Sequence, residues 1–69
     1  MARINAGKCI QIAQVMSGKS SEQVALDLKI HVQTLYRLRN QSDMRIQKLH
    51  DFAEYFGIEF FDFLKLGRN

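Results

Sequence analysis

The sequence predicts an all-α fold, a compact bundle of five short helices that form a single domain over residues 1–69. Three observations predict this fold. Apolar residues recur at helical spacing in five segments, glycines stand where two of these segments should stop, and the second and third segments are separated by only three residues. A chain of 69 residues with a hydrophobic fraction of 46% can form one compact core and little else.

The first helix is expected over residues 4–16, with Ile10 and Ala13 facing inward. Asn5 is a candidate N-cap, and Gly18 is a natural stop because glycine adopts the left-handed conformation that follows many helix ends. Gly7 should weaken this helix by roughly 1 kcal/mol, so its start is drawn toward residues 5–8.

The stretch 20–40 contains two short amphipathic segments. Residues 21–28 place Val24, Ala25 and Leu28 on one face, with Ser20 or Ser21 as the N-cap, and residues 32–38 place Leu35 and Leu38 on another. Residues 29–31 are too few for anything but a turn. Two helices in about 20 residues with a turn of 3–4 residues have the spacing of a DNA-binding helix-turn-helix.

The remaining residues of 33–38, together with Arg39, carry polar side chains. Its side chains both donate and accept hydrogen bonds, and two of them are guanidinium groups, so they are suited to reading base edges and holding phosphates. These residues are Gln33, Thr34, Tyr36, Arg37 and Arg39.

The fourth helix is expected over residues 45–56, ended by Gly57, and the fifth over residues 59–66. The fifth carries Phe60, Phe61 and Phe63, and three phenylalanines in four residues exceed what one face of a short helix can bury. Phe61 is therefore expected to be partly exposed or to lie in a subunit interface. Phe61 and Phe63 are candidate dimer contacts, and an isolated exposed ring is the alternative.

Charge is distributed unevenly along the chain. The net charge is +3, made up of +5 over residues 1–50 and −2 over residues 51–69. A basic front and an acidic back suit a protein that presents one side to a polyanion such as nucleic acid.

Composition argues against several other classes. Cys9 is the single cysteine, which excludes an internal disulfide, suits a reducing cytoplasm and makes Cys9 a packing residue. No apolar run approaches the ~18 residues of a membrane span, and the first residues lack a signal-peptide core. We find no nucleophile beside a base, no glycine-rich phosphate loop and no Cys/His cluster with metal spacing. We therefore expect a cytoplasmic protein without enzymatic activity, cofactor, small-molecule ligand or membrane partner.

The stretch 20–40 resembles the helix-turn-helix of Cro and phage-repressor type regulators, the lambda-repressor-like domains. Their pattern is Ser-Gln-x-x-Leu-Ala-x-x-Leu-Gly-Val-Ser followed by x-x-Thr-Ile-x-x-Ile/Leu. The positions that fall on it are Ser20, Val24, Ala25, Leu28, Ile30, Thr34, Leu35, Arg37 and Leu38, and the likeness extends to Asp-Phe-Leu at 62–64 and, more faintly, back to Ile10.

The sequence departs from this pattern at two places that bear on the site. Lys29 replaces the usual turn glycine, so either the turn is strained or Lys29 is left-handed at a cost of roughly 1 kcal/mol. Many members pair an Arg late in the first helix with a Glu after the recognition helix. Here these positions hold Gln14 and Arg39, so the ion pair is absent and Arg39 is expected to be free to meet a phosphate.

The resemblance implies sequence-specific binding of double-stranded DNA by a small transcriptional regulator, most similar to a phage or prophage Cro or repressor that acts by occupying an operator. It implies base contacts from Val32, Gln33, Tyr36 and Arg37, in which Gln33 pairs with adenine and Arg37 with guanine. Phosphate contacts are expected from Lys19, Ser21, Thr34, Arg39, Asn40, Ser42 and Arg45. A homodimer would place two recognition helices ~34 Å apart.

Two alternatives remain open at this point. The domain could be an antitoxin-like or polymerase-contacting protein-interaction module anchored by Phe61 and Phe63. It could also be a restriction–modification controller, a DNA binder that mainly activates transcription.

Overall fold

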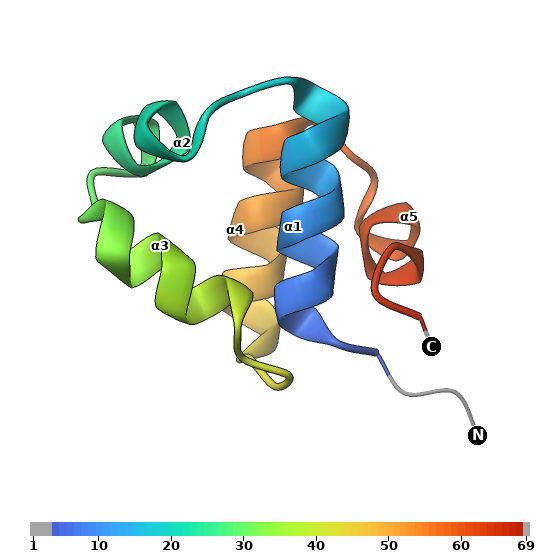
Figure 1. Ribbon diagram of the computed structural model, residues 1–69. Coiled ribbons are helices and arrows are strands. Elements are labelled where there is room, and N and C mark those ends of the chain that lie inside the picture. The colour runs from blue at the N-terminus through green and yellow to red at the C-terminus, as the bar shows by residue number, and fades with distance from the viewer. Residues whose placement is uncertain (1–3, 69) are drawn as a thin grey trace.

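The computed structural model describes residues 4–68 and confirms the all-α fold with five helices (Figure 1). In chain order they are α1 (Ala6–Ser17), α2 (Ser21–Leu28), α3 (Val32–Arg39), α4 (Ile46–Phe56) and α5 (Phe60–Lys65). Over the same residues the only β-type pairing is an isolated antiparallel bridge between Ile4 and Arg68. None of the described helices is both long and apolar enough to cross a membrane.

The helix ends follow local sequence chemistry. The Asn5 side chain accepts a hydrogen bond from the Lys8 N–H at 3.0 Å, and the Ser20 hydroxyl accepts one from the Gln23 N–H at 3.1 Å. Gly18 and Gly57 end α1 and α4 in the left-handed conformation, with φ of 72° and 68°. The predicted N-cap and both predicted stops are confirmed.

The turn between α2 and α3 is built without glycine. Lys29 has a φ of 59° and is the only non-glycine residue of the described chain with positive φ. Its N–H bonds to the Leu26 carbonyl at 3.1 Å, and the Ile30 N–H bonds to the Ala25 carbonyl at 3.0 Å. This is the double closure that usually surrounds a left-handed glycine, so Lys29 itself adopts the strained conformation.

The helices form two groups around one core: α1, α4 and α5 in one, and α2 and α3 in the other. α1 and α4 lie side by side, α5 packs against both, and α3 crosses to α1 and carries α2 on its far side (Figure 1). Leu35 anchors α3 in this core and is fully buried. The buried apolar side chains are Ala6, Cys9, Ile10, Ala13, Val24, Ala25, Leu35, Leu49, Phe52, Ala53 and Phe63.

Cys9 is a packing residue, as its single occurrence suggested. The side chain is fully buried, and this burial raises the pKa of the thiol. A buried thiol with a raised pKa carries little of the reactive thiolate.

The start of α1 holds the end of α3. The Gly7 N–H donates to the Gln41 carbonyl at 2.7 Å, the Ala6 N–H donates to the Ser42 carbonyl at 3.0 Å, and the Gln11 side chain donates to the Arg39 carbonyl at 2.8 Å. A Cβ at Gly7 would lie 2.1 Å from the Arg39 oxygen. Glycine is therefore required for this close approach, which local helix propensity could not indicate.

The three phenylalanines of α5 have different surroundings. Phe63 is fully buried in the core, so the expectation that it contributes to a dimer interface is wrong: the ring fills the space between α5 and its neighbours. Phe60 is half-buried and stacks on His50 with a ring-centroid separation of 3.6 Å. Phe61 is 68% exposed, and the expectation of an exposed ring at this position is confirmed.

Candidate nucleic-acid interface

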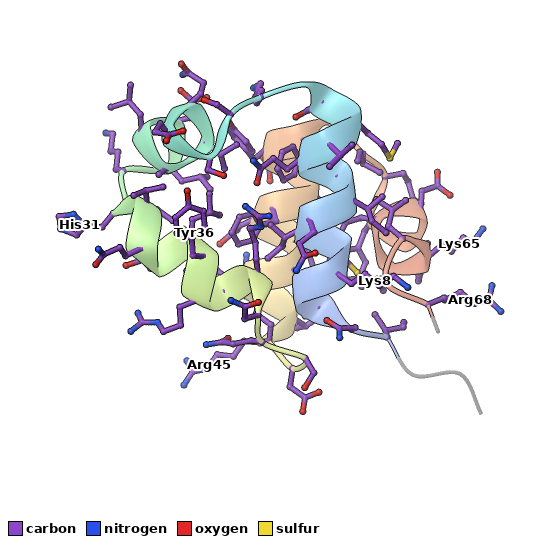
Figure 2. The ribbon with its side chains drawn as sticks, viewed as in Figure 1. Lys8, His31, Tyr36, Arg45, Lys65 and Arg68 are labelled. Carbon is purple, nitrogen blue, oxygen red and sulfur yellow. The ribbon has the colours of Figure 1, made fainter. Side chains whose placement is uncertain are left out.

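The outer face of α3 carries the predicted base contacts. Gln33, Tyr36 and Arg37 are exposed, and Val32 is half-buried at the start of the helix. His31 precedes it, points away from the bundle and makes no capping hydrogen bond (Figure 2). Because Leu35 fixes the opposite face in the core, the polar row can present its side chains without moving the helix.

A polar hollow lies between α1 and the second half of α3. It is lined by Gln11, Tyr36, Arg39 and Asn40. The Arg39 guanidinium stands 5.7 Å from the centre of the Tyr36 ring, and the Asn40 side chain donates to the Tyr36 carbonyl at 3.0 Å. Donor groups therefore line a recess beside the exposed row of α3, and such groups are suited to binding a phosphate oxygen.

Arg39 is not free, contrary to the sequence-based expectation. Its Nη1 donates to the Ser21 hydroxyl at 3.1 Å, and the Gln14 amide donates to the same oxygen at 3.1 Å and to the Lys19 carbonyl at 3.3 Å. In place of the ion pair that the resemblance implies, the neutral Ser21 hydroxyl of α2 is shared by Gln14 of α1 and Arg39 of α3. The replacement is incomplete, because Gln14 Oε1 and Arg39 Nε are buried without a hydrogen-bond partner.

Lys19, a predicted phosphate contact, is also engaged within the chain. Its ammonium lies 3.9 Å from Asp27 Oδ2, 3.4 Å from the Tyr55 hydroxyl and 4.5 Å from the centre of the Tyr55 ring. The Tyr55 hydroxyl donates to Asp27 Oδ2 at 2.5 Å. A phosphate at the start of α2 would therefore compete with Asp27 for this lysine.

This contact has consequences for titration. Burial of the hydroxyl and the adjacent Asp27 carboxylate raise the pKa of Tyr55 to about 12. The Tyr55 hydroxyl in turn lowers the pKa of Asp27, with smaller contributions from Gln23 and Lys19. Because the folded protein holds the Tyr55 proton more tightly than the unfolded chain does, the protonated hydroxyl stabilises the fold. This contribution is complete below the ordinary tyrosine pKa of about 10 and is lost as the pH rises through about 12.

We expect a Tyr36→Phe variant, which leaves Tyr55 as the only tyrosine, to form phenolate with a midpoint near pH 12. Asp27→Asn in the same background should lower the midpoint only in part, because burial of the hydroxyl remains. An absorbance titration measures both values. A midpoint near 10 for the Tyr36→Phe protein would contradict the Tyr55–Asp27 contact.

The loop after α3 presents three more of the predicted phosphate contacts. Asn40, Ser42 and Arg45 are exposed, and the Arg45 side chain extends away from the bundle (Figure 2). The carbonyls of Gln41 and Ser42 are held by the start of α1, so this loop has a fixed path.

Thr34 and Arg37 border a second hollow, which also includes Lys48 and Asp51 of α4. Thr34 is half-buried, so of this pair Arg37 is the more accessible. Lys48, which the sequence analysis did not single out, borders the same hollow as Arg37.

Residues 12–67 match the family model of the Cro/C1-type HTH DNA-binding domain. The chain belongs to this family. The comparisons with curated proteins and with solved structures gave no match. In a Cro/C1-type HTH domain, α2 and α3 are the helix-turn-helix and α3 is its recognition helix. Membership supports a DNA-binding regulator, and the family is typically non-enzymatic.

Proposed function

We propose that this Cro/C1-type domain is a sequence-specific regulator of transcription that inserts α3 into the major groove of an operator. The observation that carries the proposal is the row of exposed Gln33, Tyr36 and Arg37 on a helix whose other face is anchored by buried Leu35. Repression by operator occupancy, a phage or prophage origin and a place in the bacterial cytoplasm are parts of the same proposal.

The base contacts follow from side-chain geometry. Arg37 can form a bidentate pair with guanine, Gln33 can form one with adenine, and Val32 can pack on a thymine methyl group. Around them, Asn40, Ser42 and Arg45 would contact the phosphates on one side of the groove. Lys19 and Ser21 lie at the start of α2, and the Arg39 guanidinium reaches Ser21 from the end of α3. Helix N–H groups and the positive end of the dipole there favour a phosphate on the other side.

We also propose that the regulator binds as a homodimer through α4 and α5. Phe61 is 68% exposed and Ile46 is 66% exposed, and Ile46 borders an apolar groove with Ile4, Phe60 and Leu64. A second copy would cover these side chains and place two recognition helices about one DNA turn, ~34 Å, apart. One small domain makes few base contacts, so a dimer would supply the specificity that a single copy lacks.

The experiment that tests the proposal is selection of bound duplexes from random DNA at ~150 mM salt, near physiological ionic strength. A palindrome with half-sites about ten base pairs apart would support both the regulator and its dimer. A single half-site would support the regulator and contradict the dimer. An absence of enrichment would instead favour a protein-interaction module anchored by exposed Phe61. Whether the regulator represses or activates, as a restriction–modification controller does, is decided by a promoter assay.

Arg37→Ala is expected to weaken binding to the selected site by about 1–3 kcal/mol and to relax the base preference at one position, because a bidentate base contact is lost. Arg45→Ala is expected to weaken all duplexes about equally and to reduce the slope of log affinity against log salt by about 1. Titrations of both variants against the selected and a scrambled duplex measure these effects. Unchanged affinity of Arg37→Ala for the selected site would show that α3 is not placed in the groove as proposed.

A further inference from the structure

The helix-turn-helix has few attachments to the rest of the domain. α2 is eight residues long, buries only Val24 and Ala25, and among the helices packs mainly against α3, its own partner in the motif. Besides the burial of Val24 in the common core, α1 and α4 each reach α2 through a side-chain hydrogen bond. One of these is the Gln14–Ser21 bond from α1, and the other comes from α4.

The bond from α4 is made by Tyr55. This residue lies in the last turn of α4, and its hydroxyl donates to Asp27 Oδ2 in the last turn of α2 at 2.5 Å. The Gln23 side chain donates to the other carboxylate oxygen at 2.7 Å, so both oxygens of Asp27 are bonded. The Lys19 ammonium lies against this group and partly balances its charge. We call Lys19, Asp27 and Tyr55 the α2 clamp.

The strength of this contact comes from its charge. A hydroxyl that donates to a carboxylate at such a distance forms a charge-assisted hydrogen bond, about twice as strong as a neutral one. The lysine stacked over the tyrosine ring adds a cation–π contact to the same group. Three separate chain segments, the α1–α2 connection, the end of α2 and the end of α4, thus meet at one hydroxyl.

We propose that Tyr55 is a positioning residue for DNA binding, which holds the helix-turn-helix through Asp27 in the orientation that the duplex requires. The proposal rests on the proposed function, because α2 would meet a phosphate while α3 meets the bases. Both contacts form at once only if α2 and α3 are fixed relative to the scaffold. If α2 were mobile in the free protein, binding would have to fix its orientation, and the entropy lost in doing so would lower the affinity for DNA.

The decisive variant is Tyr55→Phe, which removes one hydroxyl and keeps the ring that packs edge-on against Phe56. Amide hydrogen exchange of the free protein and affinity for the selected duplex are measured on the same sample. We expect α2 amides to exchange roughly tenfold faster, because an opening of α2 no longer has to break this hydrogen bond. Affinity for the duplex is expected to fall roughly three- to tenfold.

A matched pair of charge variants controls for electrostatics. Asp27→Asn and Asp62→Asn each remove one negative charge, but the Asp62 carboxylate lies 3.8 Å from the ammonium of Lys65 on its own helix, away from α2. Faster exchange in α2 is expected for Asp27→Asn and not for Asp62→Asn.

The outcomes separate the two proposals. Unchanged α2 exchange in Tyr55→Phe would overturn the α2 clamp. Faster α2 exchange with unchanged affinity would overturn the positioning role of Tyr55. If the wild-type protein selected no duplex, the proposed function would fail, and the exchange measurement would still decide whether Tyr55 holds α2.

Discussion

Phe63→Ala is expected to lower the free energy of unfolding by about 3–5 kcal/mol, because truncation of a fully buried ring removes its apolar contacts and leaves a cavity. Domains of this size have a total stability of roughly 3–10 kcal/mol. The expected loss is therefore a large part of the total stability, and the urea midpoint of the variant should fall in proportion. Urea denaturation followed by circular dichroism measures the loss.

Phe61→Ser provides the contrast on the same helix. Phe61 is 68% exposed, so its replacement should change the free energy of unfolding of the monomer by no more than about 0.5 kcal/mol. If Phe61 lies in the proposed dimer interface, the variant should instead weaken self-association in sedimentation equilibrium. Equal destabilisation by Phe61→Ser and Phe63→Ala at high dilution would contradict the different roles assigned to the two rings.

Elements that depend on local chemistry could be predicted from the sequence. The bounds of α2 agree with the expectation, and those of the other helices differ by one or two residues at one or both ends. Asn5 and Ser20 cap the helices they precede, and the glycines at 18 and 57 end theirs. Such signals act within a few residues along the chain, so they can be recognised without the fold.

Other features depend on residues that are distant in sequence. The contact between Asp27 and Tyr55 joins positions 28 residues apart, and no periodicity in either helix indicates it. The full burial of Phe63, which removes it from a dimer interface, depends on the direction from which α1 and α4 meet α5. The use of Arg39 to hold Ser21 was missed for the same reason, since an exposed basic residue after a recognition helix is ordinarily assigned to a phosphate.

The candidate site likewise has features that the sequence alone predicts and features that require the tertiary structure. The exposure of Gln33, Tyr36 and Arg37 follows from the phase of one amphipathic helix, and the sequence alone predicts it. The engagement of Lys19 and Arg39 by Asp27, Tyr55 and Ser21 requires the tertiary structure. Residues expected as phosphate contacts thus also connect the helices that would carry them.

Helix propensity and tertiary structure predict opposite changes in stability for Gly7→Ala. Alanine is the better helix former by about 1 kcal/mol, so helix propensity alone predicts a more stable α1. The structure predicts a loss of about 3 kcal/mol or more, because the new Cβ would lie 2.1 Å from the Arg39 carbonyl oxygen and 2.6 Å from that of Gln41. Both atoms belong to the backbone, so relief requires a shift of the end of α3 or of the loop after it.

Gly18→Ala is the matched control for this substitution. Gly18 has a φ of 72° but a Cβ there would meet no atom within 4 Å, so its loss should be only about 1–2 kcal/mol of backbone strain. Thermal unfolding of both variants shows which of them loses more stability. At a temperature where Gly7→Ala is folded, its affinity for DNA should also fall, because Arg39 and Asn40 move with the displaced segment. If Gly7→Ala were as stable as the wild type, the docking of α3 on the start of α1 would be incorrect. If the loss occurs as expected, the absence of a side chain at buried Gly7 is what lets the end of α3 dock on the start of α1.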